Sequence, residues 1–451
     1  MKIANVQTDA LVTKPLKTSP ATGAALATMG FNGSIPLIHG AQGCSAFSKV
    51  YLISHFREPF PIQNSAIDQV SAVMGTEENL TEALKNICER QKPKFISVLT
   101  SGLVEMQGCD IWLTVKKFRV DFPEYSHVEI VPVSTPDFRG TMETGFAKLV
   151  NTVVKQCCDQ APLSVITNQV NVLCSVSVTP ADIDLLERYL NAFDLQPIFL
   201  PDLSSSMDGH LEKSDHQETS TGGTTQEQLS RVSSSRLTIV IGQSMRQTAV
   251  WLNTRFAIPW FEVSMGIAET DKLIYRLSNH TGKQVPFWMT RARSRLQDAM
   301  LDTHFVITNA PVAMAVEPDL AIGLNHILCE VGADIQHIVT TYEPLNSSIF
   351  DPSKLSTGDM SLLDGDYENI DVLYGNSHIG KLCPSNIGVI KVGFPCNDHY
   401  GNTDQCYLGY EGMRSQLFRL ANTLHQVSDD EVKPHVSRYA FTQQEVTHDC
   451  S

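Results

Sequence analysis

The chain has 451 residues, of which 42% are hydrophobic and 18% charged, proportions typical of a globular protein. A chain of this length is too long for one ordinary hydrophobic core, so we expect about three domains. The formal net charge of −15 argues against a nucleic-acid partner or an anionic membrane surface, because binding phosphate groups requires a face rich in Lys and Arg.

The first 20 residues contain no apolar signal segment, and no run of about 18 apolar residues occurs in the sequence. We therefore expect neither secretion nor a membrane span, but a cytoplasmic protein. In that compartment the 11 cysteines should be reduced thiols, some of them free to bind metal. They form no CxxC pair, so a metal site made by this chain alone is not predicted.

The N-terminal segment, residues 1–28, is polar and contains two prolines, which predicts an extended arm. A first domain, residues 29–165, then opens with the stretch from Ile35 to Cys44, which predicts a short buried strand and a Gly-rich turn. Gly40 and Gly43 permit positive φ and leave room for a bulky group beside the Cys44 sulfur. By spacing alone, a single cysteine after a strand is more often a small buried side chain than a metal ligand.

Alternating helices and strands fill the rest of the first domain. The run 94–100 is continuously apolar, which is typical of a strand in a parallel sheet covered on both faces. We predict a second strand at 128–133 and helices at 77–90, 105–119 and 140–157.

A second domain, residues 166–300, begins with a predicted strand at 171–178. Thr179 is suited to cap the helix that follows, and Pro180 to occupy its first position. Further strands are predicted at 197–200 and 237–242, and a helix at 266–279. The segment 204–235 is rich in Ser, Thr, Gly and acidic residues, which predicts a long polar insertion on the surface.

A third domain, residues 301–426, precedes a polar C-terminal tail, residues 427–451. Its predicted strands lie at 311–316, 335–341, 371–375 and 388–393, and its predicted helices at 317–328 and 409–424. Three consecutive blocks of this kind predict an α/β protein with three Rossmann-like domains and mostly parallel sheets. Ligands in such sheets bind at the C-terminal ends of strands, where Cys44, Ser101 and His378 fall.

Other motifs carry weaker functional signals. No GxGxxG follows the first strand and no GxxxxGK[ST] occurs, so nucleotide binding rests on fold alone. His39 is suited equally to a satisfied structural role and to contact with a cluster, whereas capping is expected for the region of His378 and a turn around Cys396. The charged and aromatic segment from His55 to Pro59 is a candidate partner-facing surface.

Several motifs, taken together, resemble the nitrogenase molybdenum-iron protein superfamily. They are Gly40-Ala41-Gln42-Gly43-Cys44, His55-Phe56-Arg57-Glu58-Pro59, Ala66-Ile67-Asp68-Gln69-Val70, Leu200-Pro201-Asp202 with Gly222-Gly223-Thr224, and Val392-Gly393-Phe394-Pro395. The similarity runs from about residue 20 to about residue 426. The order and spacing of these motifs make the resemblance specific. It implies a fold like that of nitrogenase component 1.

The resemblance also implies a metal site. In catalytic β subunits of this superfamily, three first-domain cysteines bind half of an eight-iron P-cluster. The first corresponds to Cys44 here, but the second corresponds to Ile62 and the third to Gly102, neither of which supplies a thiolate. The resemblance therefore implies a smaller 4Fe-4S cluster at a subunit interface, with Cys44 as one iron ligand and the others from a partner.

Within the superfamily, the chain is most similar to the scaffolds that build the iron-molybdenum cofactor. That similarity implies a heterotetramer with two copies each of this chain and a NifE-type subunit, which holds most of the cofactor precursor. It further implies NifB as precursor donor and a docking surface for the Fe protein NifH. An assembly scaffold is thus favoured over a stand-alone enzyme, and no catalytic residue is assigned.

Two alternatives remain open at this point. One is a catalytic β-type subunit of nitrogenase or of a related tetrapyrrole reductase. The other is a cluster-free Rossmann protein that binds a nucleotide or sugar.

Overall fold

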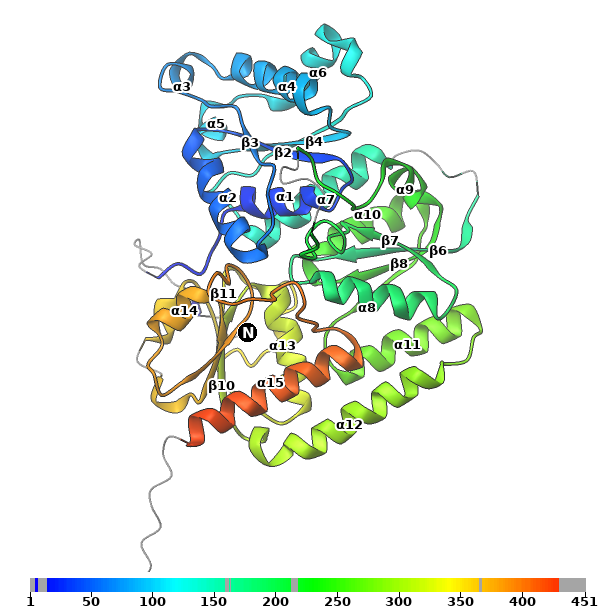
Figure 1. Cartoon of the computed structure of the whole chain (residues 1–451), viewed down its shortest axis with the longest axis vertical. Helices are drawn as coiled ribbons and strands as arrows, with labels where there is room; N and C mark the ends of the chain where they lie inside the picture. The colour runs from blue at the N-terminus through cyan, green and yellow to red at the C-terminus, as the bar shows by residue number, and fades with distance from the viewer. Residues whose placement is uncertain are drawn as a thin grey trace, which may run out of the picture.

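The computed structural model describes residues 5–6, 14–158, 162, 164–211, 218–364 and 367–429. Within them lie three sheets whose strand pairs are all parallel, each flanked by helices (Figure 1). This arrangement confirms the predicted α/β class. The predicted tail lies outside the described residues from 430 onward. No described helix combines the length and apolar character needed to span a bilayer.

The first domain contains a sheet of four strands. In spatial order these are β3 (Gln63–Asn64), β2 (Ser34–His39), β4 (Phe95–Thr100) and β5 (Glu129–Val133). The surrounding helices are α1 (Pro20–Met29), α2 (Gln42–Phe56), α3 (Ser71–Met74), α4 (Glu77–Gln91), α5 (Gly102–Gln107), α6 (Ile111–Asp121) and α7 (Met142–Cys157). The single helix predicted at 105–119 is wrong: Gly108 has φ +74° and ends α5, and Asp110 caps α6.

Helix α1 contradicts the predicted arm, which extended to residue 28. Every residue of α1 is buried, so the helix shows no amphipathic pattern in the sequence. A Cβ on Gly23 would collide with the Met142 carbonyl oxygen, and one on Gly145 with the Pro20 carbonyl oxygen. The small residues of this segment thus reflect a close crossing between α1 and α7 rather than an extended chain.

The segment before α1 connects the first domain to the third. Strand β1 (Asn5–Val6) pairs in parallel with β12 (Leu355–Thr357) of the third sheet. Further along, Leu16 is buried in the core of that domain, and Lys14 Nζ lies 2.6 Å from an Asp364 carboxylate oxygen. Residues 14–19, called the strap below, therefore run from the third domain to the start of α1.

The second domain is built on the sheet β7 (Gln196–Leu200), β6 (Ile166–Cys174), β8 (Ser235–Ile241) and β9 (Trp260–Val263). Its helices are α8 (Pro180–Asn191), α9 (Gln226–Arg231), α10 (Arg246–Phe256), α11 (Ile267–Thr281) and α12 (Phe287–Ile307). Thr179 caps α8 as predicted. The strand predicted at 171–178 ends earlier, at Cys174. The predicted boundary between residues 300 and 301 falls inside the continuous helix α12.

The polar insertion 204–235 is only partly a surface feature. Residues 212–217 lie outside the described part of the chain. The Ser220 hydroxyl donates to the Phe31 carbonyl oxygen at 2.6 Å and accepts from the Ser34 backbone N–H at 2.8 Å. Thr224 forms a parallel bridge with Phe31. The end of the insertion is therefore attached to the first domain, at the start of strand β2.

The third domain contains a sheet of six strands: β1, β12, β11 (Asp334–Thr340), β10 (Pro311–Val316), β13 (Val372–Gly375) and β14 (Gly388–Lys391). Its helices are α13 (Pro318–Glu330), α14 (Ser377–Leu382) and α15 (Gly409–Asp429). The four predicted strands and two predicted helices of this domain are confirmed. The closing helix α15 packs along α12, which joins the second and third domains (Figure 1).

Buried carboxylates meet where the three domains converge. Glu143 of α7 is 1% exposed, accepts from the Asp319 backbone N–H at 2.9 Å and accepts from the Tyr342 hydroxyl. Asp319 in turn accepts from Ser244 of the second domain at 2.6 Å. Glu317 accepts from the hydroxyl of Thr141 at 3.1 Å. Burial raises the pKa of Glu143 well above its usual range, that of Glu317 to about 7 and that of Asp319 to about 6.

These raised pKa values predict that the folding stability of the chain depends on pH. A carboxyl group whose pKa is higher in the folded than in the unfolded chain favours folding at low pH and loses that contribution as pH rises through the folded value. Glu317→Gln should therefore gain stability relative to the parent between pH 5 and pH 8, by on the order of 2 kcal/mol. The measurement is the difference in thermal unfolding midpoint between Glu317→Gln and the parent, taken at pH 5 and at pH 8.

The comparison with the parent chain is needed because two histidines act in the opposite direction. Burial lowers the pKa of His39 to about 4 and that of His55 to about 3, so the folded chain loses stability as pH falls below about 6.5. Glu227→Gln, at an exposed side chain, is the matched control. Its thermal midpoint should differ from that of the parent by the same amount at both pH values. If Glu317→Gln changes the thermal midpoint by the same amount at both pH values, ionisation of Glu317 does not cost folding stability at the domain junction.

Candidate metal-cluster site

Cys44 lies in the first turn of α2, directly after the central strand β2. All six residues of β2 are buried, and β3 and β4 flank it, so the strand fixes where α2 begins. The sequence predicted a turn at Cys44, but Gly43 and Cys44 are already helical. Gly40 and Gly43 are not among the positive-φ residues. Their importance is steric instead: a Cβ on Gly40 would lie 2.7 Å from the Ser101 hydroxyl, and one on Gly43 would meet open space.

The two positions that the resemblance aligns with cysteines hold no metal-binding side chain. Ile62 is 6% exposed and belongs to the apolar core. Gly102 begins α5 after strand β4. Among the described residues, no three His, Cys, Asp or Glu side chains come together in a way that could hold a metal ion. Any cluster bound at Cys44 therefore needs ligands from outside this part of the chain.

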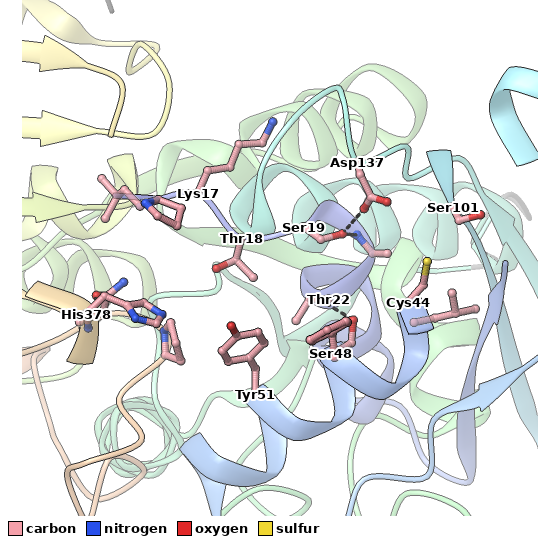
Figure 2. Close-up of a pocket in the computed structure, with 17 residues that line it drawn as sticks. Lys17, Thr18, Ser19, Thr22, Cys44, Ser48, Tyr51, Ser101, Asp137 and His378 are labelled. Atoms are coloured by element: carbon pink, nitrogen blue, oxygen red, sulfur yellow. Dashed lines mark hydrogen bonds between the residues drawn. The ribbon is translucent and has the colours of Figure 1, made fainter. Parts of the chain in front are cut away.

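The structure brings the predicted strand ends together around one cavity. Cys44, Ser101 and His378 follow β2, β4 and β13, and all three line a cavity of about 370 Å³ (Figure 2). The strap and α2 form further walls, so the cavity lies between the first and third domains. The strand-end rule for parallel sheets predicted that each of these residues lies at the end of a strand, but not that all three line one cavity.

Burial and charge both act on the Cys44 thiol. The side chain is half-buried, and burial, with a smaller contribution from the Asp137 carboxylate, raises the pKa of this thiol above its usual value. Figure 2 shows the sulfur pointing toward the side of the cavity where Ser101 and Asp137 lie. Asp137 accepts a hydrogen bond from the Ser19 hydroxyl at 2.5 Å. Without a cation the thiol is thus expected to keep its proton, whereas metal binding would displace it.

These features fit one thiolate ligand of a metal cluster. The sulfur is partly accessible, open space adjoins Gly43, and no second thiolate donor is present at Ile62 or Gly102. Iron–sulfur clusters are held by Cys thiolates, usually four in number. Cys44 can supply one of them.

Two other residues that the sequence singled out, His39 and Cys396, do not line the cavity. His39 is fully buried, and its Nδ1 lies 2.8 Å from the Ser65 hydroxyl, which agrees with a satisfied structural histidine. Cys396 is buried, and burial raises the pKa of its thiol to about 12. The turn expected around Cys396 contains a cis peptide bond between Phe394 and Pro395.

The segment from His55 to Pro59, a candidate partner-facing surface from the sequence, contacts the third domain of the same chain. His55 Nδ1 accepts from the Cys396 backbone N–H at 2.9 Å, and Arg57 donates to the Asn397 carbonyl oxygen at 2.7 Å. The Arg57 guanidinium also lies 4.9 Å from the centre of the Tyr400 ring. These contacts join the end of α2 to the third domain of the same chain.

The sequence did not single out several residues of the cavity. Thr18, Ser19, Tyr51 and Asp137 all line it. Asp137 follows the predicted strand β5, so the strand-end rule could have identified it. Tyr51 lies seven residues after Cys44, which places both side chains on the same face of α2. No local signal marks the strap residues, whose position depends on the distant sheet that holds β1.

Comparison with known proteins defines the class of the chain. The family model described as nitrogenase component 1 type oxidoreductase matches residues 19–425. The chain therefore belongs to the nitrogenase component 1 type oxidoreductase family. A solved structure titled "Nitrogenase Cp1 at pH 6.5" is similar with a TM-score of 0.87 and 27% identity, covering 96% of this chain and 98% of that one.

Within this family, the chain is similar to relatives that share one name. The chain is 38% identical to the nitrogenase iron-molybdenum cofactor biosynthesis protein NifN of Klebsiella pneumoniae over 432 residues, 92% of each chain. It is 37% identical to the protein of the same name from Nostoc sp., covering 96% of this chain and 98% of the relative. These matches confirm the resemblance drawn from the sequence motifs.

Proposed function

We propose that the chain is one subunit of a scaffold complex that builds the nitrogenase iron-molybdenum cofactor. In this complex it contributes Cys44 to an interfacial 4Fe-4S cluster, and a NifE-type subunit supplies the other ligands in a heterotetramer with two copies of each chain. The cofactor precursor comes from NifB and is held mainly by the partner. The chain also offers a docking surface to the Fe protein NifH, and assembly takes place in the cytoplasm.

The observation that carries this proposal is Cys44, the one thiol among the residues that line the cavity. A cluster with one ligand from this chain has to lie at its surface, where a partner can reach it. When bound, an iron–sulfur cluster supplies one-electron transfer. Cys44 would hold one iron, while the buried strands β2 and β4 fix the position of its sulfur.

An exposed apolar face around this site supports the need for a partner. The helices α2, α3 and α5 lie along the same side of the first domain (Figure 1). Their most exposed large apolar side chains are Phe47 at 71%, Val50 at 62%, Val73 at 84%, Met74 at 81% and Met106 at 81%. Apolar surface of this kind is typical of protein interfaces.

This apolar face gives a prediction about assembly. Placing a charge at Phe47 or Met106 should weaken the complex, because an unpaired carboxylate would be buried at the interface. We expect Phe47→Glu and Met106→Glu each to weaken partner binding at least about tenfold, measured by co-purification and analytical ultracentrifugation. Leu211→Glu, at a side chain 99% exposed in the second domain, is the control and should bind normally. Equal binding by all three variants would locate the interface elsewhere.

The function itself is tested by cofactor transfer. The purified complex, incubated anaerobically with a NifB-derived precursor, Fe protein, metal and homocitrate, should activate a cofactor-free nitrogenase component 1. The same complex should not reduce nitrogenase substrates with Fe protein and reductant. Failure to activate the recipient, with precursor loading verified by iron content, would refute the scaffold role.

The alternative, a catalytic β-type subunit, keeps one specific supporting observation. The chain is 27% identical to a nitrogenase component 1 structure over nearly its whole length. Substrate reduction by the purified complex would establish this alternative.

A further inference from the structure

Ser101, the residue that follows strand β4, lines the same cavity as Cys44. It occupies the N-cap position of α5, where a serine hydroxyl usually accepts a hydrogen bond from a backbone N–H of the first turn. The Ser101 side chain makes no such capping bond. The residue is 2% exposed, and its hydroxyl has no hydrogen-bond partner among the described residues. A buried hydroxyl without a partner costs folding stability, so helix capping does not explain this serine.

The surrounding backbone fixes where the Ser101 hydroxyl lies. The preceding residue, Thr100, forms two hydrogen bonds with Thr135 beyond β5, at 2.8 and 2.9 Å, which hold the ends of β4 and β5 together. A Cβ on Gly40 would lie 2.7 Å from the Ser101 hydroxyl oxygen, so glycine at this position leaves room for the hydroxyl. The hydroxyl therefore has a defined place beside the turn that leads into α2, the helix that carries Cys44.

The Cys44 sulfur points toward the side of the cavity where Ser101 lies (Figure 2). The Asp137 carboxylate lies on this side as well, but it accepts its hydrogen bond from the Ser19 hydroxyl, at 2.5 Å. An iron–sulfur cluster bound at Cys44 would bring new acceptors into this space, because the sulfurs of such clusters accept hydrogen bonds. The unpartnered donor and the predicted metal ligand thus face the same part of the cavity.

We propose that the Ser101 hydroxyl donates a hydrogen bond to a sulfur of the iron–sulfur cluster held by Cys44 and thereby raises the reduction potential of that cluster. A hydrogen bond to sulfur withdraws electron density, so it stabilises the reduced form more than the oxidised form. The negative charge of Asp137 acts in the opposite direction, because it opposes the addition of an electron. This role of Ser101 rests on the proposed function, since it requires a cluster at Cys44.

The first test measures the reduction potential of the cluster in the purified complex with the NifE-type partner, by a redox titration followed by electron paramagnetic resonance. Ser101→Ala should lower the potential. Loss of one hydrogen bond should change the equilibrium constant for reduction about fivefold, which corresponds to about 40 mV for one electron. Asp137→Asn should raise the potential. The iron content of every complex is measured as well, so that only complexes with a four-iron cluster are compared.

Ser48→Ala is the matched control for Ser101→Ala. Ser48 also lines the cavity and is buried, but its hydroxyl already lies 2.9 Å from the hydroxyl of Thr22. The complex that contains Ser48→Ala should therefore keep the potential of the parent complex.

A second measurement uses the full chain without a cluster, so it does not depend on cluster loading. Ser101→Ala should have a thermal unfolding midpoint equal to or above that of the parent, because it removes a buried hydroxyl that has no partner. Ser48→Ala should have a lower midpoint, because it removes the partner of the Thr22 hydroxyl. If Ser101→Ala lowers the midpoint as much as Ser48→Ala, the Ser101 hydroxyl already has a structural partner, and the proposed role is overturned.

The two measurements separate this role from the proposed function. A four-iron complex of Ser101→Ala whose potential equals or exceeds that of the parent would overturn the role of Ser101 and leave the proposed function intact. A parent complex without a Cys44-dependent cluster would refute both.

Discussion

Replacing Cys44 with Ala is expected to remove the interfacial cluster while leaving the chain folded. The side chain is half-buried at the start of α2, so loss of its sulfur creates little cavity in the core. Each pair of subunits should lose about four iron atoms, because a 4Fe-4S cluster rarely persists after one of its thiolates is removed. Iron analysis and the electron paramagnetic resonance spectrum of the reduced complex measure this loss.

Cys109→Ala is the matched control for this experiment. It removes another half-buried thiol of the first domain, and its sulfur lies 4.0 Å from His39 Nε2, outside the cavity. This variant should retain the iron content and spectrum of the parent complex. Unchanged iron and an unchanged spectrum in Cys44→Ala would show that Cys44 is not a ligand.

A second large effect is expected where α1 crosses α7. Gly145→Val should prevent stable folding, because even a Cβ at this position would collide with the backbone of Pro20. Neither helix can shift easily, since all of α1 is buried. Overpacking against backbone should cost about 3 kcal/mol or more. The readout is soluble yield and the thermal unfolding midpoint.

Gly43→Ala provides the comparison for this prediction. Gly43 is also helical, but a Cβ there has open space around it. The thermal unfolding midpoint of Gly43→Ala should equal or slightly exceed that of the parent, because Ala has a higher helix propensity than Gly. A Gly145→Val chain with the parent midpoint would mean that α1 and α7 are not closely packed.

The sequence predicted the three sheets because their central strands are short, continuously apolar runs such as 95–100 and 311–316. It missed α1, whose residues are buried on every side and so show no helical period. It also missed β1 and β12, strands of two and three residues that are defined only by their pairing. Local patterns thus predicted the elements that carry their own periodicity, and tertiary packing determined the others.

The sequence likewise predicted some residues of the candidate site and missed others. Cys44, Ser101 and His378 were each expected at the end of a strand, because ligands in parallel sheets bind at the C-terminal strand ends. Their meeting in one cavity between two domains depends on how the first and third sheets face each other, which no single motif specifies. The place of Tyr51 depends on where α2 begins, and that of Thr18 on the route of the strap. Such residues are found only once the domains are in position.

We propose that Cys44 binds a cluster only together with a partner chain. The most direct test of this proposal is iron and acid-labile sulfide analysis after anaerobic reconstitution of the chain alone and of the chain with its NifE-type partner. Since this chain offers one thiolate at the site, we expect a Cys44-dependent four-iron cluster in the complex and none in the isolated chain. A stable four-iron cluster in the isolated chain, or none dependent on Cys44 in the complex, would contradict it.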